Sequence, residues 1–219
     1  MIRLVIADDH PLVRGGLTAI LGAEADLQVV GEAADGRAAG RAAAAHAADV
    51  VLMDVQMPGA DGIVGTQEVL SRRPQAKVLV LTTFDLDEYV FSALRVGASG
   101  FLLKTTPAAE LAAGIRAVHS GDMLFAPTIT RRLVETYVQR PPRPNGVPVA
   151  LSNLTQRELD VLRGIARGLS NAEIARELFV GEATVKTHVT HILTKLGLRD
   201  RIQAVVLAYE VGLAVPSRE

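Results

Sequence analysis

Short apolar runs alternate with longer amphipathic segments over the first half of the chain. Five runs rich in branched aliphatic residues are expected to be strands at residues 4–7, 27–31, 50–54, 78–81 and 100–103. Helical periodicity follows each of them, at about residues 12–21, 36–47, 63–70, 89–96 and 107–119. Because strands buried on both faces are apolar throughout, this alternation predicts a parallel sheet with helices on both faces.

The pattern changes after residue 138. A helix is expected over about 128–138, and four prolines within residues 141–148 then exclude a helix or a central strand. From residue 151 onward, four helical segments without a strand pattern predict a small all-α unit. We therefore expect one domain at 1–122, a linker at 123–150 and a second domain at 151–219.

Three helix starts in the second domain have the side chains of a capping box or resemble one. They are Thr155 with Glu158, Ser170 with Glu173, and Asp200 with Gln203. A turn that ends at Gly181 and Glu182 joins the second helix of this domain to the third. Two helices joined by such a tight turn form a helix-turn-helix.

Composition excludes several classes of protein and leaves others open. The chain has no cysteine, which excludes disulfides and thiolate metal sites. Its first residues do not form a signal peptide, and no apolar run approaches the roughly 18 residues of a membrane span, so we expect a cytoplasmic protein without a membrane partner. Residues 1–139 carry 16 acidic and 12 basic side chains, and residues 151–219 carry 8 and 9. This balance neither requires nor excludes nucleic acid.

Polar side chains follow the expected strands of the first domain. Asp8 and Asp9 follow the first strand, Asp54 ends the third, Thr82 follows the fourth and Lys104 the fifth. The carboxyl ends of parallel strands share one edge of the sheet, where ligands bind. Each side chain alone has a plainer explanation, namely a helix cap, a turn, a strand-end cap or a solvated lysine. Their occurrence at successive strand ends favours a site.

Three carboxylates at one edge repel one another unless a cation neutralises them. Oxygen ligands favour Mg²⁺, and we find no histidine or cysteine at the strand ends to indicate zinc or iron. Asp54 could then be a nucleophile that forms an acyl phosphate. Mg²⁺ and Lys104 would stabilise the phosphoryl oxygens, and Thr82 would donate a hydrogen bond to one of them.

These residues, together with the Gln-Met-Pro-Gly that starts at Gln56, the pair Asp61-Gly62 and the segment 97–104, resemble the receiver domain of a bacterial two-component response regulator. The resemblance covers residues 1 to about 122. It implies a flavodoxin-like, doubly wound, five-stranded parallel sheet. It also implies the following roles: Asp54 as phosphoacceptor; Asp8, Asp9, Asp54 and the carbonyl of Gln56 as Mg²⁺ ligands; Thr82 and Lys104 as phosphoryl-binding groups; and Phe101 as an aromatic switch. An ordinary core phenylalanine is the alternative for Phe101.

The third helix of the second domain is amphipathic when projected at 100° per residue. One side carries Val185, Val189, Ile192 and Leu196. The other side carries Thr187, Thr190, His191 and Thr194, with Lys186 and His188 on the flanks. A helix with a small hydrogen-bonding face can enter the major groove of DNA, although a solvated face is the plainer alternative.

The second domain resembles the LuxR-type helix-turn-helix. The matching segments are 154–158, 168–175, 184–189 and 195–197. With the receiver, this indicates a response regulator of the NarL/FixJ type. The resemblance implies that Lys186, Thr187 and Thr190 face DNA, with His191 and Thr194 on the same side. Two departures are Gly181, often serine in the family, and Thr190, where several relatives carry a basic residue. Fewer charges predict weaker phosphate contact per monomer and a greater dependence on dimerisation.

Val205 and Val206 in the last helix resemble the family's dimer contact, and burial within their own domain is the alternative. We therefore expect a phosphorylation-dependent, sequence-specific DNA-binding transcription regulator that is not an enzyme, apart from slow dephosphorylation of itself. Its partners would be a sensor histidine kinase, double-stranded DNA and a second copy of the chain. Two alternatives are an Mg²⁺-dependent phosphohydrolase and a DNA-binding protein whose receiver is not phosphorylated. The first usually needs an acid two residues after the nucleophile, where this chain has Gln56.

Overall fold

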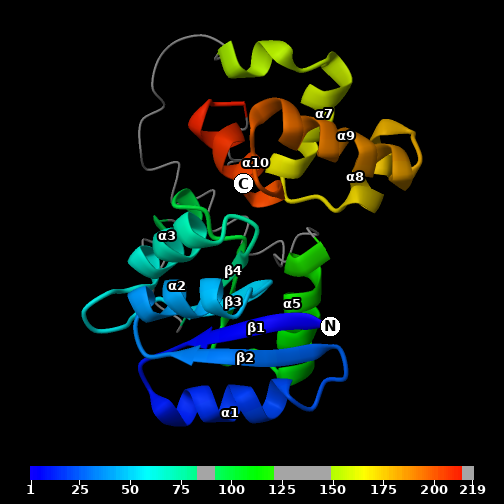
Figure 1. Ribbon diagram of the computed structural model, residues 1–219. Helices are drawn as coiled ribbons and strands as arrows, with labels where there is room; N and C mark the ends of the chain where they lie inside the picture. Colours follow the sequence, from blue (N-terminus) through cyan, green and yellow to red (C-terminus); the bar gives the residue numbers. More distant parts are fainter. Residues whose placement is uncertain (83–91, 121–148, 214–219) are drawn as a thin grey trace. The chain divides into compact units, whose positions relative to one another are not determined.

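The computed structural model describes residues 1–82, 92–120 and 149–213 (Figure 1). The chain divides into two compact units, Met1–Leu124 and Phe125–Glu219. Each unit is described by itself.

The first unit is built on a five-stranded parallel sheet. Its strands are β1 (Ile2–Ala7), β2 (Leu27–Ala33), β3 (Val50–Asp54), β4 (Lys77–Thr82) and β5 (Gly100–Leu103). Their order is β2-β1-β3-β4-β5, and all four neighbouring pairs are parallel. This is the flavodoxin-like order, so the predicted fold class is confirmed. Every residue of β3 is buried, which explains why its sequence is apolar up to its last position.

Helices flank this sheet on both faces (Figure 1). They are α1 (Pro11–Leu21), α2 (Gly36–Ala45), α3 (Gly62–Arg72) and α5 (Ala108–Ser120). Helix α2 packs against α3, and α1 packs against α5. Asp61 is the N-cap of α3 and accepts hydrogen bonds from the amides of Ile63 and Val64. This cap sets the start of the helix that follows the β3 loop.

The described part of the second unit, residues 149–213, consists of helices. They are a short 3₁₀ segment η1 (Val149–Asn153) followed by α7 (Gln156–Ala166), α8 (Asn171–Leu178), α9 (Glu182–Leu196) and α10 (Arg201–Glu210). The capping boxes expected at Thr155 and Ser170 are present, with both reciprocal hydrogen bonds in each. Asp200 caps α10 through the amide of Gln203. Gly181 at the N-cap of α9 offers no side-chain bond, as its sequence predicts.

The core of the second unit is formed by apolar faces of α7, α9 and α10. Leu162, Ile165, Ile192 and Ala208 are among its fully buried side chains. Helices α8 and α9 meet at a tight turn in which Phe179 adopts the left-handed conformation, with a φ of 54°. The pair is a helix-turn-helix, so the predicted all-α domain is confirmed.

Some predicted elements lie outside the described residues. They are the helix expected over 128–138, the proline-rich linker and the start of the helix expected over 89–96, of which residues 92–95 are described and helical. Within the described parts of the chain, no helix is both long enough and apolar enough to cross a membrane.

Candidate functional site

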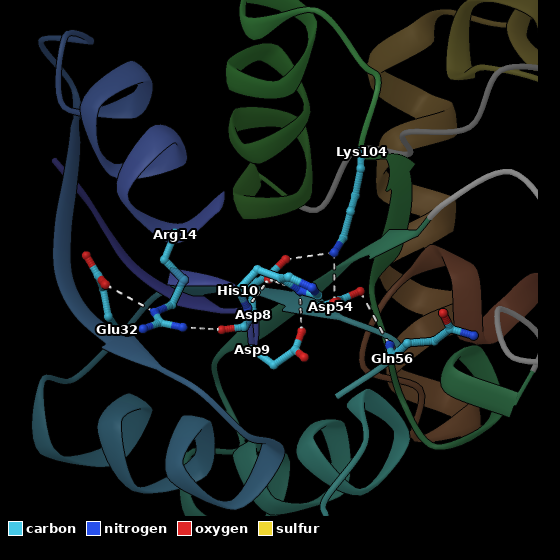
Figure 2. Close-up of polar contacts among 8 residues, drawn as sticks. All are labelled: Asp8, Asp9, His10, Arg14, Glu32, Asp54, Gln56 and Lys104. Atoms are coloured by element: carbon cyan, nitrogen blue, oxygen red, sulfur yellow. Dashed lines mark hydrogen bonds and ion pairs between the residues drawn. The ribbon is translucent and has the colours of Figure 1, made fainter. Parts of the chain in front are cut away.

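The predicted strand-end side chains meet at the carboxyl edge of the sheet. Asp8 follows β1, Asp54 ends β3 and Lys104 follows β5. Lys104 reaches across this edge, and its Nζ lies 2.7 Å from Asp8 Oδ2 and 2.7 Å from Asp54 Oδ2 (Figure 2). Asp8 is 1% exposed and Asp54 is 4% exposed, so two carboxylates and one ammonium form a largely buried cluster. We call these three residues the acidic pocket.

The two carboxylates also make the local bonds that a turn residue would make. Asp8 Oδ1 accepts a hydrogen bond from the amide of His10 at 2.8 Å. Asp54 Oδ1 accepts one from the amide of Gln56 at 3.3 Å. In both cases the second oxygen is bound to Lys104, which comes from a distant part of the chain. The turn explanation therefore accounts for only half of the contacts of each carboxylate.

Burial and charge act in opposite directions on the groups of the acidic pocket. Burial raises the pKa of the Asp54 carboxyl above its ordinary value, and the hydrogen bond from Lys104 only partly offsets this effect. Burial alone would lower the pKa of Lys104, but the hydrogen bonds to Asp54 and Asp8 outweigh it and raise that pKa. Lys104 therefore stays charged, while Asp54 is a more basic carboxylate than an exposed aspartate.

Gly62 brings the start of α3 directly against the backbone of Asp54. A Cβ at this position would lie 2.2 Å from the carbonyl oxygen of Asp54 and 2.9 Å from the Cα of Val55. Real Cβ atoms do not approach that closely, so only glycine permits this contact. The amide of Gly62 also donates a hydrogen bond to the carbonyl of Val55 at 2.9 Å. The segment between β3 and α3 is thus held where it supports Asp54.

Asp9 and His10 form the more open side of the pocket. The Asp9 side chain is 24% exposed, and His10 Nδ1 lies 2.7 Å from Asp9 Oδ1 and 3.5 Å from Asp8 Oδ1 (Figure 2). The sequence-based statement that no histidine lies at the strand ends is therefore wrong, because His10 directly follows Asp9. The sequence itself places His10 there, directly after the two aspartates that follow the first strand.

The residues at this edge fit a hard divalent cation. Ligand atoms of Asp8, Asp9 and His10 all lie within 4.8 Å of one another. Asp8, Asp9 and Asp54 supply three negative charges when ionised, and Lys104 neutralises only one of them. A donor set dominated by carboxylate oxygens with excess negative charge suits Mg²⁺.

Thr82 and Phe101 line neighbouring strands. Thr82 is the last residue of β4 and is 3% exposed, and its carbonyl accepts a hydrogen bond from the amide of Lys104 at 2.8 Å. This bond ties the end of β4 to the start of the segment that carries the pocket lysine. Phe101 pairs with Val80 in the register of β4 and β5 and is 6% exposed. It has the buried position of a core phenylalanine.

The sequence analysis did not identify the residues of α1 and β2 that support Asp8. Arg14 in α1 donates a hydrogen bond from Nη1 to the Asp8 carbonyl at 2.6 Å, and its Nε reaches Glu32 Oε2 at 3.3 Å. Glu32 also accepts a hydrogen bond from Thr18 at 2.9 Å. These contacts connect α1 and β2 to the end of β1 (Figure 2). They depend on two elements packing together, which periodicity alone does not reveal.

The second candidate site is the outer face of α9, which we define as Lys186, Thr187, Thr190, His191 and Thr194. All five residues are exposed. The opposite side of the helix buries Val185, Val189 and Ile192. The predicted amphipathic division of this helix is therefore present.

The hydroxyls on this face are turned toward the helix itself. Thr187 Oγ1 donates to the Ala183 carbonyl at 3.0 Å, Thr190 Oγ1 to the Lys186 carbonyl at 3.1 Å, and Thr194 Oγ1 to the Thr190 carbonyl at 2.9 Å. Such bonds to the carbonyl four residues earlier are a common alternative for threonine in helices.

An ion pair that sequence reasoning missed holds α9 against α7. Lys195 Nζ lies 2.7 Å from Glu158 Oε2, and the same oxygen accepts hydrogen bonds from the amide and hydroxyl of Thr155. Burial opposes ionisation of Glu158, but these contacts outweigh it and lower its pKa to about 2. The capping box was evident from the sequence, whereas its link to α9 depends on how the helices pack.

The expected dimer contact, Val205 and Val206, lies in α10 and stays a prediction. Val205 is only 4% exposed, because it packs within its own unit, so it offers almost no surface to a second copy. Val206 is partly exposed. The alternative of burial within the domain therefore holds for Val205.

Both units match known protein families. A family model of the response regulator receiver domain matches residues 4–116, and one of bacterial regulatory proteins of the luxR family matches residues 152–208. Among curated relatives, the transcriptional regulatory protein YxjL of Bacillus subtilis is 44% identical over 97% of each chain. LiaR of the same species is 42% identical, over 95% of this chain and 97% of that one. The oxygen regulatory protein NreC of Staphylococcus carnosus is 40% identical, over 96% of this chain and 98% of that one.

Solved structures of similar proteins agree with these matches. The response regulator ChrA of a heme-sensing two-component system is 38% identical over 97% of this chain and 98% of that one, with a TM-score of 0.52. A complex of the two-component response regulator RcsB with DNA is 25% identical over 96% of this chain and 98% of that one, with a TM-score of 0.55. With a receiver sheet, a luxR-family helix-turn-helix and relatives that cover 95–97% of its length, this chain belongs to the two-component response regulators that act as transcription regulators.

Proposed function

We propose that Asp54 accepts a phosphoryl group from a phosphohistidine of a sensor histidine kinase. An Asp54 carboxylate oxygen would attack the phosphorus, the bond between phosphorus and the histidine nitrogen would break, and an acyl phosphate would form on Asp54. The observation that carries this proposal is the double contact of Lys104 Nζ with Asp8 and Asp54, at 2.7 Å each. A cation held between two buried carboxylates is positioned to bind a phosphoryl oxygen that arrives at one of them.

We propose the other roles from the resemblance to the receiver domain. Asp8, Asp9, Asp54 and the backbone carbonyl of Gln56 would hold Mg²⁺, which when bound neutralises the phosphoryl oxygens. Thr82 would donate a hydrogen bond to the phosphoryl group, and Phe101 would follow Thr82 as it moves. His10, which contacts Asp8 and Asp9, would have to give up those contacts for the cation to enter.

The phosphoryl acceptor is testable by intact-protein mass spectrometry. Incubation with a small acyl phosphate and Mg²⁺ should add one phosphoryl group, and peptide mapping should place it on Asp54. Asp54→Asn should remain unlabelled, whereas Glu110→Gln, which alters an exposed carboxylate in α5, should label like the unmodified protein. Labelling of Asp54→Asn on the same peptide would contradict the assignment. A protein that binds DNA but takes up no phosphate would favour the unphosphorylated alternative.

We propose that the second unit binds double-stranded DNA through the outer face of α9. Five exposed polar side chains on a helix whose other side is buried are the arrangement that a major groove accommodates. We also propose that residues 1–122 regulate this binding through the linker at 123–150, with residues 151–219 as the DNA-binding domain.

Regulation would act through assembly. The unphosphorylated protein should be mostly monomeric and bind DNA weakly, and phosphorylation should shift the population toward a dimer that binds two half-sites. Sedimentation should therefore show a higher mass after phosphorylation, and a fragment of residues 151–219 should bind DNA without it. This expectation assumes that the unphosphorylated receiver masks the recognition helix α9. If the fragment binds no better than the unphosphorylated whole chain, that masking is wrong and dimerisation alone must control binding.

A further inference from the structure

The three threonines on the outer face of α9 make the same kind of hydrogen bond. Thr187, Thr190 and Thr194 are all exposed, yet each hydroxyl hydrogen is already donated to a carbonyl of the same helix, at 2.9–3.1 Å. A hydroxyl has one hydrogen to donate and two lone pairs that accept. What these side chains can offer an approaching ligand is therefore an acceptor oxygen and a methyl group.

Because each hydroxyl hydrogen is already donated within the helix, the threonines favour some contacts with a ligand over others. Redirecting one hydroxyl toward a ligand acceptor would break an existing hydrogen bond in order to form a new one, so little would be gained. Accepting a hydrogen bond, or packing the methyl group against an apolar surface, leaves the bond within the helix in place. The three side chains therefore favour ligand donors and ligand methyl groups over ligand acceptors.

The bases of DNA differ in this respect in the major groove. A G·C pair presents the guanine acceptors N7 and O6 and the cytosine amino donor, and an A·T pair also presents acceptors and one amino donor, so donors on the bases do not separate the two pairs. The group that an A·T pair alone presents is the C5-methyl group of thymine. The lysine at the C-terminal end of the helix is not available to read guanine, because Lys195 Nζ is held by Glu158 at 2.7 Å. On the outer face itself, Lys186 and His191 are the side chains that can donate.

We infer that α9 recognises A·T base pairs through thymine methyl groups, which pack against the methyl groups of Thr187, Thr190 and Thr194. The threonine oxygens are then free to accept hydrogen bonds from the adenine amino groups. This inference rests on the proposed function, in which the outer face of α9 enters the major groove. It adds the class of base pair that this face selects.

The test begins with selection of duplexes from a random pool by the full-length protein, after treatment with an acyl phosphate and Mg²⁺. The enriched half-sites should contain A·T pairs. Each thymine is then replaced, one at a time, by deoxyuridine, which removes only the methyl group. Burial of one such group is worth about 0.8 kcal/mol, so affinity should fall about fourfold at the contacted positions. Deoxyuridine placed outside the half-sites is the matched control and should have no effect.

Paired variants then identify the side chain at each position. Thr190→Ser keeps the hydroxyl and removes the methyl group, so it should bind thymine and deoxyuridine equally at the position that Thr190 contacts. Thr190→Val keeps a methyl group and removes the hydroxyl, so it should retain the discrimination. The same pairs at residues 187 and 194 complete the set. Thermal unfolding should show that these exposed substitutions leave the stability of the second unit nearly unchanged.

The outcomes separate the inference from the function on which it rests. If no duplex is enriched, DNA binding by α9 fails, and the inference fails with it. If a site is enriched and Lys186→Ala weakens its binding, but deoxyuridine is neutral at every position, DNA binding stands and methyl recognition is overturned. Half-sites made of G·C pairs would overturn it equally.

Discussion

The acidic pocket and the outer face of α9 are built in opposite ways. The pocket joins Asp8, Asp54 and Lys104, which are far apart in the sequence and lie almost buried at one edge of a sheet. The face of α9 joins residues within nine positions of one another, and all of them are exposed. Charges in the pocket are coupled to the fold, whereas side chains on α9 can change with little effect on it. Substitutions in the acidic pocket should therefore disturb the fold of the first unit. Substitutions on the outer face of α9 should change the DNA sequence preference with little effect on the fold of the second.

Two lysines provide the most direct way to test this contrast. Lys104→Met would leave Asp8 and Asp54 buried without their ammonium, and we expect it to destabilise the first unit by roughly 2–4 kcal/mol. Lys186→Met on the exposed face should change stability by less than about 0.5 kcal/mol. Hydrogen exchange of peptides from β1 and β3, measured by mass spectrometry, would report the first unit without interference from the second.

The loss of stability in Lys104→Met should depend on pH. Asp54 already has a raised pKa in the folded protein, so its ionised form is disfavoured there, and loss of Lys104 should raise that pKa further. A raised carboxyl pKa means greater stability at low pH, which is lost as pH rises. The penalty of Lys104→Met should therefore shrink on acidification, and added Mg²⁺ should restore part of it near neutral pH. A penalty that is equal at all pH values would show that repulsion between the carboxylates is not its cause.

Glu158 in the second unit is expected to show the reverse dependence. Its pKa is lowered from 4.5 to about 2, so it contributes stability above pH 4.5 that is lost as pH falls toward 2. Glu158→Gln should cost on the order of 1–3 kcal/mol near neutral pH, and this difference should vanish near pH 2. Urea unfolding of the fragment 151–219, followed by its helical circular dichroism, would measure it. A difference that does not change with pH would mean that the Lys195 pair contributes little.

Lys186→Ala tests the outer face of α9 through DNA binding rather than through stability. If Lys186 contacts a phosphate, its removal should weaken binding and reduce the slope of log affinity against log salt by about 1. Lys77→Ala in the first unit should leave that slope unchanged. An unaltered slope for Lys186→Ala would show that this lysine does not contact a phosphate, and would leave a base contact open.

The smallest expected effect concerns a backbone feature that both units share. Phe179 has a φ of 54° and is 95% exposed, and Ala47 has a φ of 46°. Because residues with a Cβ are strained in this region, Phe179→Gly should stabilise the second unit by roughly 0.5–1 kcal/mol, and Ala47→Gly should stabilise the first similarly. Thermal unfolding would measure both. If Phe179→Gly is stabilising but weakens DNA binding, the aromatic ring has a role in binding that its exposure alone does not establish.

Much of the fold was predictable from local patterns. The strands ending at Ala7 and Asp54 are apolar because both of their faces are covered, and the capping boxes at Thr155 and Ser170 mark helix starts through neighbouring residues alone. Such signals need no knowledge of the rest of the chain. These local signals predict the ends of elements and short elements less well: the expected strand at 27–31 extends to Ala33, and η1 was not expected.

The sequence by itself determined which side chains stand at strand ends and which stand on the outer side of α9, because periods of two and 3.6 residues follow from backbone geometry. Only the tertiary structure decided that Lys104 binds Asp8 and Asp54 together and that Lys195 is held by Glu158. It also decided that Val205 is buried. Each of these depends on distances between elements that are remote in the chain, and the packing of whole helices and strands sets those distances.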